Sequence, residues 1–132
     1  MSQEIDSKDM TIAVVGLGYV GLPLFCQLST SFPVIGYDVD IKRVEEIKKG
    51  IDSKDSVTNE QLCNALSCNQ ITTDIDEISA SKMVIVTVPT PITNNFEPDT
   101  SALENVCLSL SNVLRKGSIV VFESTIYPGA TE

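Results

Sequence analysis

The chain has 132 residues, of which 42% are apolar and 20% are charged, a balance typical of one globular domain. Its net charge of −9 repels the phosphate backbone of nucleic acids and anionic membrane surfaces, so we expect no nucleic-acid partner. No apolar run approaches the roughly 18 residues that a membrane-spanning helix requires, so we expect no membrane segment.

Residues 1–10 are polar and acidic and lack the apolar stretch of a secretory signal. We interpret them as a flexible tail and the protein as cytoplasmic. The chain has no histidine, and its four cysteines, Cys26, Cys63, Cys68 and Cys107, show no metal-binding spacing. We therefore expect no metal site, and we predict that each cysteine is a small hydrophobic residue in a reducing compartment.

The first predicted element is a strand over residues 11–15, TIAVV, whose apolar run indicates burial on both faces. A helical pattern follows over residues 19–31, with Pro23 near the first turn, where a backbone N–H has no partner to lose. Its apolar side is predicted to contain Val20, Leu24, Phe25 and Leu28. A second buried strand, PVIGY, is predicted over residues 33–37.

A second helix is predicted over residues 40–50, where Asp40 is the expected N-cap and Gly50 the expected stop. Its apolar stripe consists of Ile41, Val44 and Ile47. The next helical segment covers residues 57–66 and begins with the capping-box spacing of Thr58 and Gln61.

A weaker apolar run at residues 70–73, QITT, and a stronger one at residues 83–88, MVIVTV, indicate two further strands. The last helix is predicted over residues 101–117, with Ser101 and Glu104 in capping-box spacing. One face of this helix is lined by Leu103, Val106, Leu110, Val113 and Leu114. A final buried strand, SIVVF, is expected over residues 118–122.

Strand and helix alternate along the chain. This pattern predicts a doubly wound α/β domain, with a parallel sheet of about five strands and helices on both of its faces. Nothing in the sequence supports an all-helical or β-sandwich fold.

Three glycines, Gly16, Gly18 and Gly21, stand between the first strand and the first helix. The phosphate-binding turn of a dinucleotide site needs glycine in this spacing for three reasons: a tight turn, close approach of a pyrophosphate, and close helix packing. We expect the pyrophosphate at the N–H groups near Tyr19 and Val20, where the helix dipole favours negative charge. A glycine-rich turn without a ligand is the alternative.

An acidic residue, Asp38, ends the second predicted strand, where it would accept hydrogen bonds from both hydroxyls of the adenosine ribose. It would repel a 2′-phosphate, so NAD is predicted rather than NADP. Asp40 competes for this role but already serves as a cap. Arg43 is either stacked on the adenine or a solvated helix residue paired with Glu46.

Two further segments follow predicted strands, namely VPTPI at residues 88–92 and ESTIYPG at residues 123–129. Ligands bind beyond the carboxyl ends of the strands in an open parallel sheet. Either segment alone is typical of a rigid turn. Together with the glycines and Asp38, they place all the polar features at one edge of the sheet.

The motifs GLGYVGLP, VPTP and ESTIYPG resemble, in order and spacing, the N-terminal NAD domain of the UDP-glucose/GDP-mannose dehydrogenases. The likeness covers residues 11–132 and is strongest to the bacterial branch that oxidises UDP-N-acetylglucosamine, or its N-acetylgalactosamine and N-acetylmannosamine relatives, for surface polysaccharide. The resemblance implies a Rossmann-type NAD-binding fold in a homodimeric parent enzyme. It also implies that the C6 alcohol of the sugar is oxidised twice, through an aldehyde held on a cysteine.

The resemblance further implies which residues contact NAD, with Thr125 also positioning the catalytic water. The implied contact residues are Gly16, Leu17, Gly18, Tyr19, Val20, Gly21, Asp38, Arg43, Val88, Pro89, Thr90, Ser124 and Thr125. None of the four cysteines falls in the family's cysteine motif. We therefore expect the chain to be a fragment that stops before the family's central helix and C-terminal domains and that is inactive alone.

Three alternatives stay open at this point. The chain could be a stand-alone NAD-sensing module, which its length and the missing catalytic set would suit. The substrate could be UDP-glucose or GDP-mannose. The β-hydroxyacid dehydrogenases have a similar glycine turn, but they usually carry methionine where Val20 stands.

Overall fold

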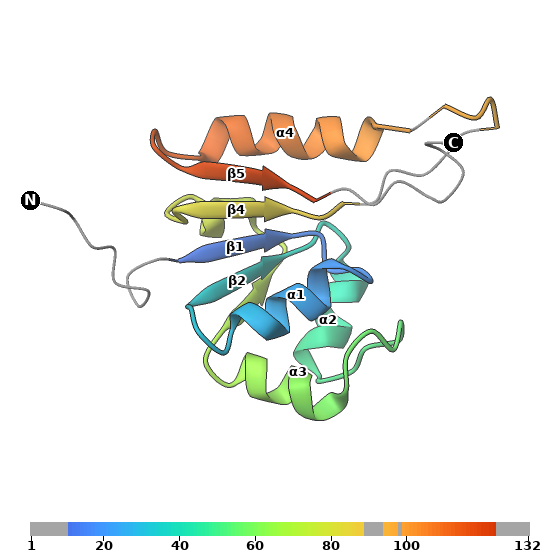
Figure 1. The fold of residues 1–132 in the computed structure, drawn as a ribbon, viewed down its shortest axis with the longest axis vertical. Coiled ribbons are helices and arrows are strands. Elements are labelled where there is room, and N and C mark those ends of the chain that lie inside the picture. The colour runs from blue at the N-terminus through green and yellow to red at the C-terminus, as the bar shows by residue number, and fades with distance from the viewer. Residues whose placement is uncertain (1–10, 89–93, 98, 124–132) are drawn as a thin grey trace, which may run out of the picture.

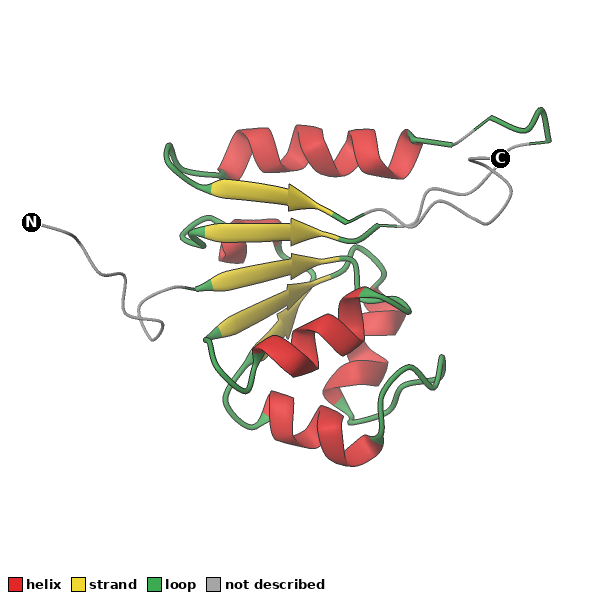
Figure 2. Ribbon diagram, in the orientation of Figure 1, coloured by secondary structure: helices red, strands yellow, loops and turns green. Residues whose placement is uncertain are grey.

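The computed structural model describes residues 11–88, 94–97 and 99–123, and the predicted tail lies outside them. The described part forms a five-stranded sheet with helices on either side of it (Figures 1 and 2). Its strands are β1 (Ile12–Val15), β2 (Val34–Tyr37), β3 (Gln70–Thr72), β4 (Met83–Val86) and β5 (Ile119–Phe122).

All neighbouring strands are parallel, in the order β3-β2-β1-β4-β5. The fold class is therefore confirmed, including the weak strand over residues 70–72. The chain builds the sheet outward from β1 in one direction and then returns to the other side of β1 for β4. This reversal opens a crevice at the carboxyl ends of β1 and β4, which is where ligands bind in such sheets.

The helices are α1 (Gly21–Leu28), α2 (Ile41–Lys48), α3 (Asn59–Leu66) and α4 (Ser101–Val113). A short 3₁₀ helix, η1 (Ile75–Ile78), was not predicted. Helices α1, α2 and α3 share one buried cluster with β1, β2 and β3, whereas η1 and α4 share another with β1, β2 and β4. The sheet is thus covered on both faces, as doubly wound folds require.

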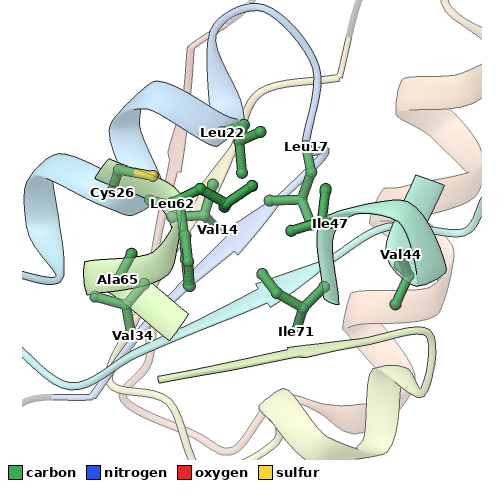
Figure 3. Packing of buried hydrophobic residues seen from close by; sticks show 11 residues of the cluster. Val14, Leu17, Leu22, Cys26, Val34, Val44, Ile47, Leu62, Ala65 and Ile71 are labelled. Carbon is green, nitrogen blue, oxygen red and sulfur yellow. The ribbon is translucent and has the colours of Figure 1, made fainter. Parts of the chain in front are cut away.

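The core beneath α1, α2 and α3 also anchors the glycine turn. The Leu17 side chain is fully buried and points toward Ile47 and Ile71 (Figure 3). Burying a leucine stabilises a fold by about 1.5–3 kcal/mol, so this contact holds the turn on the sheet.

Two of the three predicted caps are confirmed. The Asp40 carboxylate accepts the N–H of Lys42, and Thr58 and Gln61 form both bonds of a capping box. The cap predicted at Ser101 is wrong, because Ser101 is the first helical residue of α4. Its N–H and hydroxyl donate instead to the Asp99 carboxylate, at 3.0 and 2.7 Å.

The predicted burial of β5 on both faces is wrong. Val120 packs against the cluster beneath α4, but Ile119 and Val121 are 55% and 36% exposed. Among the described residues, their face of the sheet is covered by α1, α2 and α3 only over β1, β2 and β3, which leaves Ile119 and Val121 of β5 without a covering helix.

Some predicted helix faces also differ from the structure. The buried side of α1 consists of Leu22, Phe25 and Cys26, whereas Val20 and Leu24 are only half-buried. On α2, Val44 and Ile47 are buried as predicted, but Ile41 is exposed at the first helical position. Val20 is the N-cap of α1 and Ile41 is the first residue of α2, so both stand at helix ends rather than within the buried stripes.

The cysteine prediction holds for only one residue. Cys26 is buried, while Cys63, Cys68 and Cys107 are exposed, and all are free thiols. Cys63 and Cys107 lie on the solvent sides of α3 and α4.

Candidate functional site

A cleft of about 450 Å³ lies at the carboxyl ends of β1, β2 and β4. The glycine turn and the first residues of α2 form one side of it, and Ala102, Asn105, Val106 and Ser109 of α4 form the other. A larger hollow of about 580 Å³ lies between α1 and α3, away from the strand ends. The cleft is the better candidate, because the polar groups predicted to bind a ligand converge there.

The fold itself requires two of the three glycines. Gly16 has φ +94, a conformation that favours glycine, and its N–H donates to the Tyr37 carbonyl oxygen at 2.8 Å. A Cβ on Gly21 would lie 1.6 Å from the Gly16 carbonyl oxygen, so only glycine lets α1 pack on the turn. These are the predicted roles in the tight turn and the close helix packing.

Gly18 differs from the other two because nothing in the fold requires a glycine there. A Cβ at this position meets no atom within 4 Å, and its φ lies outside the left-handed region. Gly18 nevertheless lines the cleft. This combination fits a position kept small for the approach of a ligand, the predicted role of the second glycine.

The start of α1 offers hydrogen-bond donors beside Gly18. Within the described residues, the backbone N–H groups of Gly18, Tyr19 and Val20 donate no hydrogen bond. Unpaired N–H groups at the beginning of a helix favour an anion such as a pyrophosphate. The site thus supplies local positive potential in a chain of net charge −9.

Asp38 follows β2 and borders the glycine turn. One carboxylate oxygen accepts the Leu17 N–H at 2.9 Å, and the other accepts the Asp40 N–H at 2.9 Å. Asp38 lines the cleft and is half-buried. Asp40 is occupied as the N-cap of α2, whereas Asp38, which also lines the cleft, caps none of the described helices.

Arg43 is buried rather than solvated, with 5% of its surface exposed. Its Nε donates to the Leu17 carbonyl oxygen at 2.7 Å, and its Nη1 donates to Glu46 at 2.7 Å and to Asp52 at 2.8 Å. The pairing with Glu46 was one of the two predictions, and the structure adds the buried partner Asp52. The remaining amino group, Nη2, is buried without a partner among the described residues.

The Asp52 carboxylate accepts five hydrogen bonds. Besides Arg43, it accepts the N–H groups of Lys54, Ser56 and Val57 and the Ser56 hydroxyl. Burial acts to raise the pKa of Asp52, but these hydrogen bonds outweigh it and bring the pKa to about 2. Asp52 is therefore a permanent anion at neutral pH.

Thr87, after β4, was missed by the sequence reasoning. Its hydroxyl lies 2.7 Å from the Gly16 carbonyl oxygen and 3.1 Å from that of Val15, so it ties β4 to the glycine turn. Its place directly before VPTP was the available signal. Val88 lines the cleft beside it.

The structure brings only some of the predicted contact residues to the cleft. Those that line it are Gly16, Leu17, Gly18, Asp38, Arg43 and Val88. Tyr19, Val20 and Gly21 belong to the turn and the start of α1 but do not line the cleft. Pro89, Thr90, Ser124 and Thr125 lie outside the described residues.

Two features are absent from the described residues. They contain no group of three or more histidine, cysteine, aspartate or glutamate side chains that could hold a metal ion. Among the helices formed by the same residues, none is both long enough and apolar enough to cross a membrane.

Comparisons with known proteins agree with the fold. The family model described as "UDP-glucose/GDP-mannose dehydrogenase family, NAD binding domain" matches residues 10–132. UDP-N-acetyl-D-glucosamine 6-dehydrogenases of Pseudomonas aeruginosa and Salmonella typhi are each 43% identical to the chain, over 95% and 94% of it. The chain spans only 29% of the length of each.

A solved structure of a UDP-D-ManNAc dehydrogenase from Pyrococcus horikoshii superposes with a TM-score of 0.81 and 32% sequence identity. This match covers 92% of the chain and 30% of that protein. The chain therefore belongs to the UDP-glucose/GDP-mannose dehydrogenase family, and it corresponds to the NAD-binding domain of that family.

Proposed function

We propose that residues 11–132 are the NAD-binding domain of a longer nucleotide-sugar 6-dehydrogenase that acts in surface polysaccharide synthesis. The enzyme would oxidise the C6 alcohol of a UDP-N-acetylhexosamine to a carboxylate in two NAD-dependent steps. One observation carries the proposal: Gly18, which the fold does not require, faces a cleft beside Asp38 in a chain 43% identical to two UDP-N-acetyl-D-glucosamine 6-dehydrogenases.

The described residues support particular roles in binding NAD. The N–H groups from Gly18 to Val20 would hold the pyrophosphate, and Asp38 would accept the hydroxyls of the adenosine ribose. NAD itself supplies the hydride acceptor of such a reaction. Thr125 remains the proposed partner of the catalytic water.

No described cysteine is suited to the covalent step of this chemistry. Burial, with a smaller contribution from the charge of Asp52, raises the pKa of the Cys26 thiol to about 11, which makes it a poor nucleophile at neutral pH. Cys63, Cys68 and Cys107 do not line the cleft. The reactive cysteine would therefore lie in a part of the enzyme not represented in these 132 residues.

The same proposal includes the substrate, the oligomeric state and the location of the enzyme. A UDP-sugar is the expected substrate, bound mostly by residues outside this chain, and the parent is expected to be a homodimer. We propose a cytoplasmic location, and the net charge of −9 disfavours a nucleic-acid partner.

Calorimetric titration of the chain with NAD and with NADP tests the proposal. We expect NAD to bind and NADP to bind at least tenfold more weakly, because the Asp38 carboxylate repels a 2′-phosphate. Equal affinities would contradict the role of Asp38, and no binding of either would contradict the site. With NAD and UDP-N-acetylglucosamine together, we expect no NADH absorbance at 340 nm, whereas turnover would contradict the fragment interpretation.

A further inference from the structure

The turn after α2 contributes one residue, a lysine, to the lining of the cleft. Lys54 lines the cleft, and its ammonium lies 5.2 Å from the centre of the Tyr19 ring. Tyr19 belongs to the glycine turn, next to the unpaired N–H groups at the start of α1. A cation over an exposed aromatic ring is attracted by the negative face of the ring, which favours this position of the flexible lysine.

The backbone that carries Lys54 is fixed from two directions. Asp52 accepts the Lys54 N–H at 3.1 Å, while its other oxygen holds the Ser56 N–H at 2.6 Å. Glu46 of α2 accepts the Ser53 N–H at 2.7 Å. Asp52 is itself paired with the buried Arg43, so the whole turn is anchored to α2.

The charges along the cleft differ in how far they are already compensated. Asp38 and Asp40 bring negative charge to the lining, and Arg43 and Lys54 bring positive charge. Arg43 is 5% exposed and paired with two carboxylates. Among the described residues, no carboxylate lies within ion-pairing distance of the Lys54 ammonium. The uncompensated cation of the lining is therefore Lys54.

We infer that Lys54 is a cofactor-binding residue whose ammonium contacts the pyrophosphate of the dinucleotide, an inference that rests on the proposed function. A pyrophosphate on the N–H groups near Tyr19 would lie within reach of a lysine that already contacts the Tyr19 ring. Lys54 then offsets the repulsion that a chain of net charge −9 exerts on a doubly charged group.

Titration calorimetry with NAD at 50 and 300 mM NaCl tests this inference with two variants and a matched control. Lys54→Gln removes the charge, and Lys54→Arg keeps it. The control is Lys42→Gln, which removes the same charge from an exposed residue of α2 that does not line the cleft. We expect Lys54→Gln to raise the Kd of NAD about fivefold at low salt, the scale of one ion pair in water, and less at high salt. Lys54→Arg should stay near the wild type.

The outcomes separate this inference from the proposed function. A Kd unchanged by Lys54→Gln, or an equal loss in Lys42→Gln, overturns the role of Lys54 while leaving the NAD site intact. A loss that persists unchanged at high salt also overturns it, because a displaced turn would behave in that way. If the wild type does not bind NAD, both the inference and the proposed function fail.

Discussion

Asp38 and Arg43 hold opposite sides of one residue of the glycine turn. The Asp38 carboxylate accepts the Leu17 N–H at 2.9 Å, and Arg43 Nε donates to the Leu17 carbonyl oxygen at 2.7 Å. Asp38 follows β2 and Arg43 lies in α2. They stand 21 and 26 positions from Leu17 in the sequence, so both fix a peptide segment that is distant from them along the chain. Since both side chains also line the cleft, the turn and the polar groups beside it are positioned together before a ligand arrives.

The first prediction concerns the charge of Asp38. Asp38→Asn keeps an oxygen that can accept the Leu17 N–H but removes the anion. We expect the Kd of NAD to rise about tenfold, because a charge-assisted hydrogen bond to ribose becomes a neutral one. The Kd of NADP should rise less or fall, so the preference for NAD shrinks. Calorimetry measures both constants, and an unchanged ratio would contradict the assignment of Asp38 to the ribose.

Much of the fold could be predicted because its signals are local. Apolar runs predicted the ends of each strand to within two residues, and the glycine spacing identified the turn. The capping box at Thr58 and Gln61 needed only four consecutive residues. The exposure of Ile119 and Val121 could not be predicted in the same way, since it depends on which helices lie above β5.

The hydrogen bonds that support the site could not be predicted from sequence patterns. Thr87 bonds to the Val15 carbonyl oxygen across 72 positions of the chain, and Arg43 bonds to that of Leu17 across 26. Asp52 stands in a polar segment that is typical of an ordinary loop. Such contacts follow from topology, because parallel strands bring their carboxyl ends to one edge only after the sheet has formed.

A pair of glycine substitutions separates folding from binding. For Gly18→Ala, we expect a free energy of unfolding within about 0.5 kcal/mol of the wild type, because the added methyl meets open space. The Kd of NAD should rise at least tenfold, since that space belongs to the ligand. For Gly21→Ala, we expect a loss of about 2 kcal/mol or more in urea unfolding, because the methyl overlaps the Gly16 carbonyl. Normal NAD binding by Gly18→Ala would contradict the pyrophosphate position.

Thiol reactivity offers a test of the described core. Burial first, and then the Asp52 charge, raises the pKa of Cys26 to about 11, whereas Cys63, Cys68 and Cys107 are exposed. With iodoacetamide at pH 8, we expect these three to be alkylated and Cys26 to be spared, as shown by peptide mass spectrometry. In urea all four should react, which is the control. Rapid alkylation of Cys26 in the folded chain would contradict its burial on the inner face of α1.

The last prediction uses the low pKa of Asp52. The folded pKa of about 2 lies below the ordinary 3.8, so its stabilising effect is complete above pH 5 and is lost as the pH falls toward 2. The difference corresponds to about 2 kcal/mol of unfolding free energy. Asp52→Asn should cost about 3 kcal/mol at pH 7, because it leaves the buried Arg43 without one of its two anions.

Urea unfolding between pH 3 and pH 7 measures both effects. Relative to wild type, the Asp52→Asn variant should lose less stability on acidification, because the group that titrates has been removed. The matched control is Asp55→Asn in the same turn, whose carboxylate makes no hydrogen bond within the described residues. It changes the net charge equally and should leave both the stability and its pH dependence near wild type. If the two variants behave alike, the effect belongs to net charge and not to the network that joins Asp52 to Arg43.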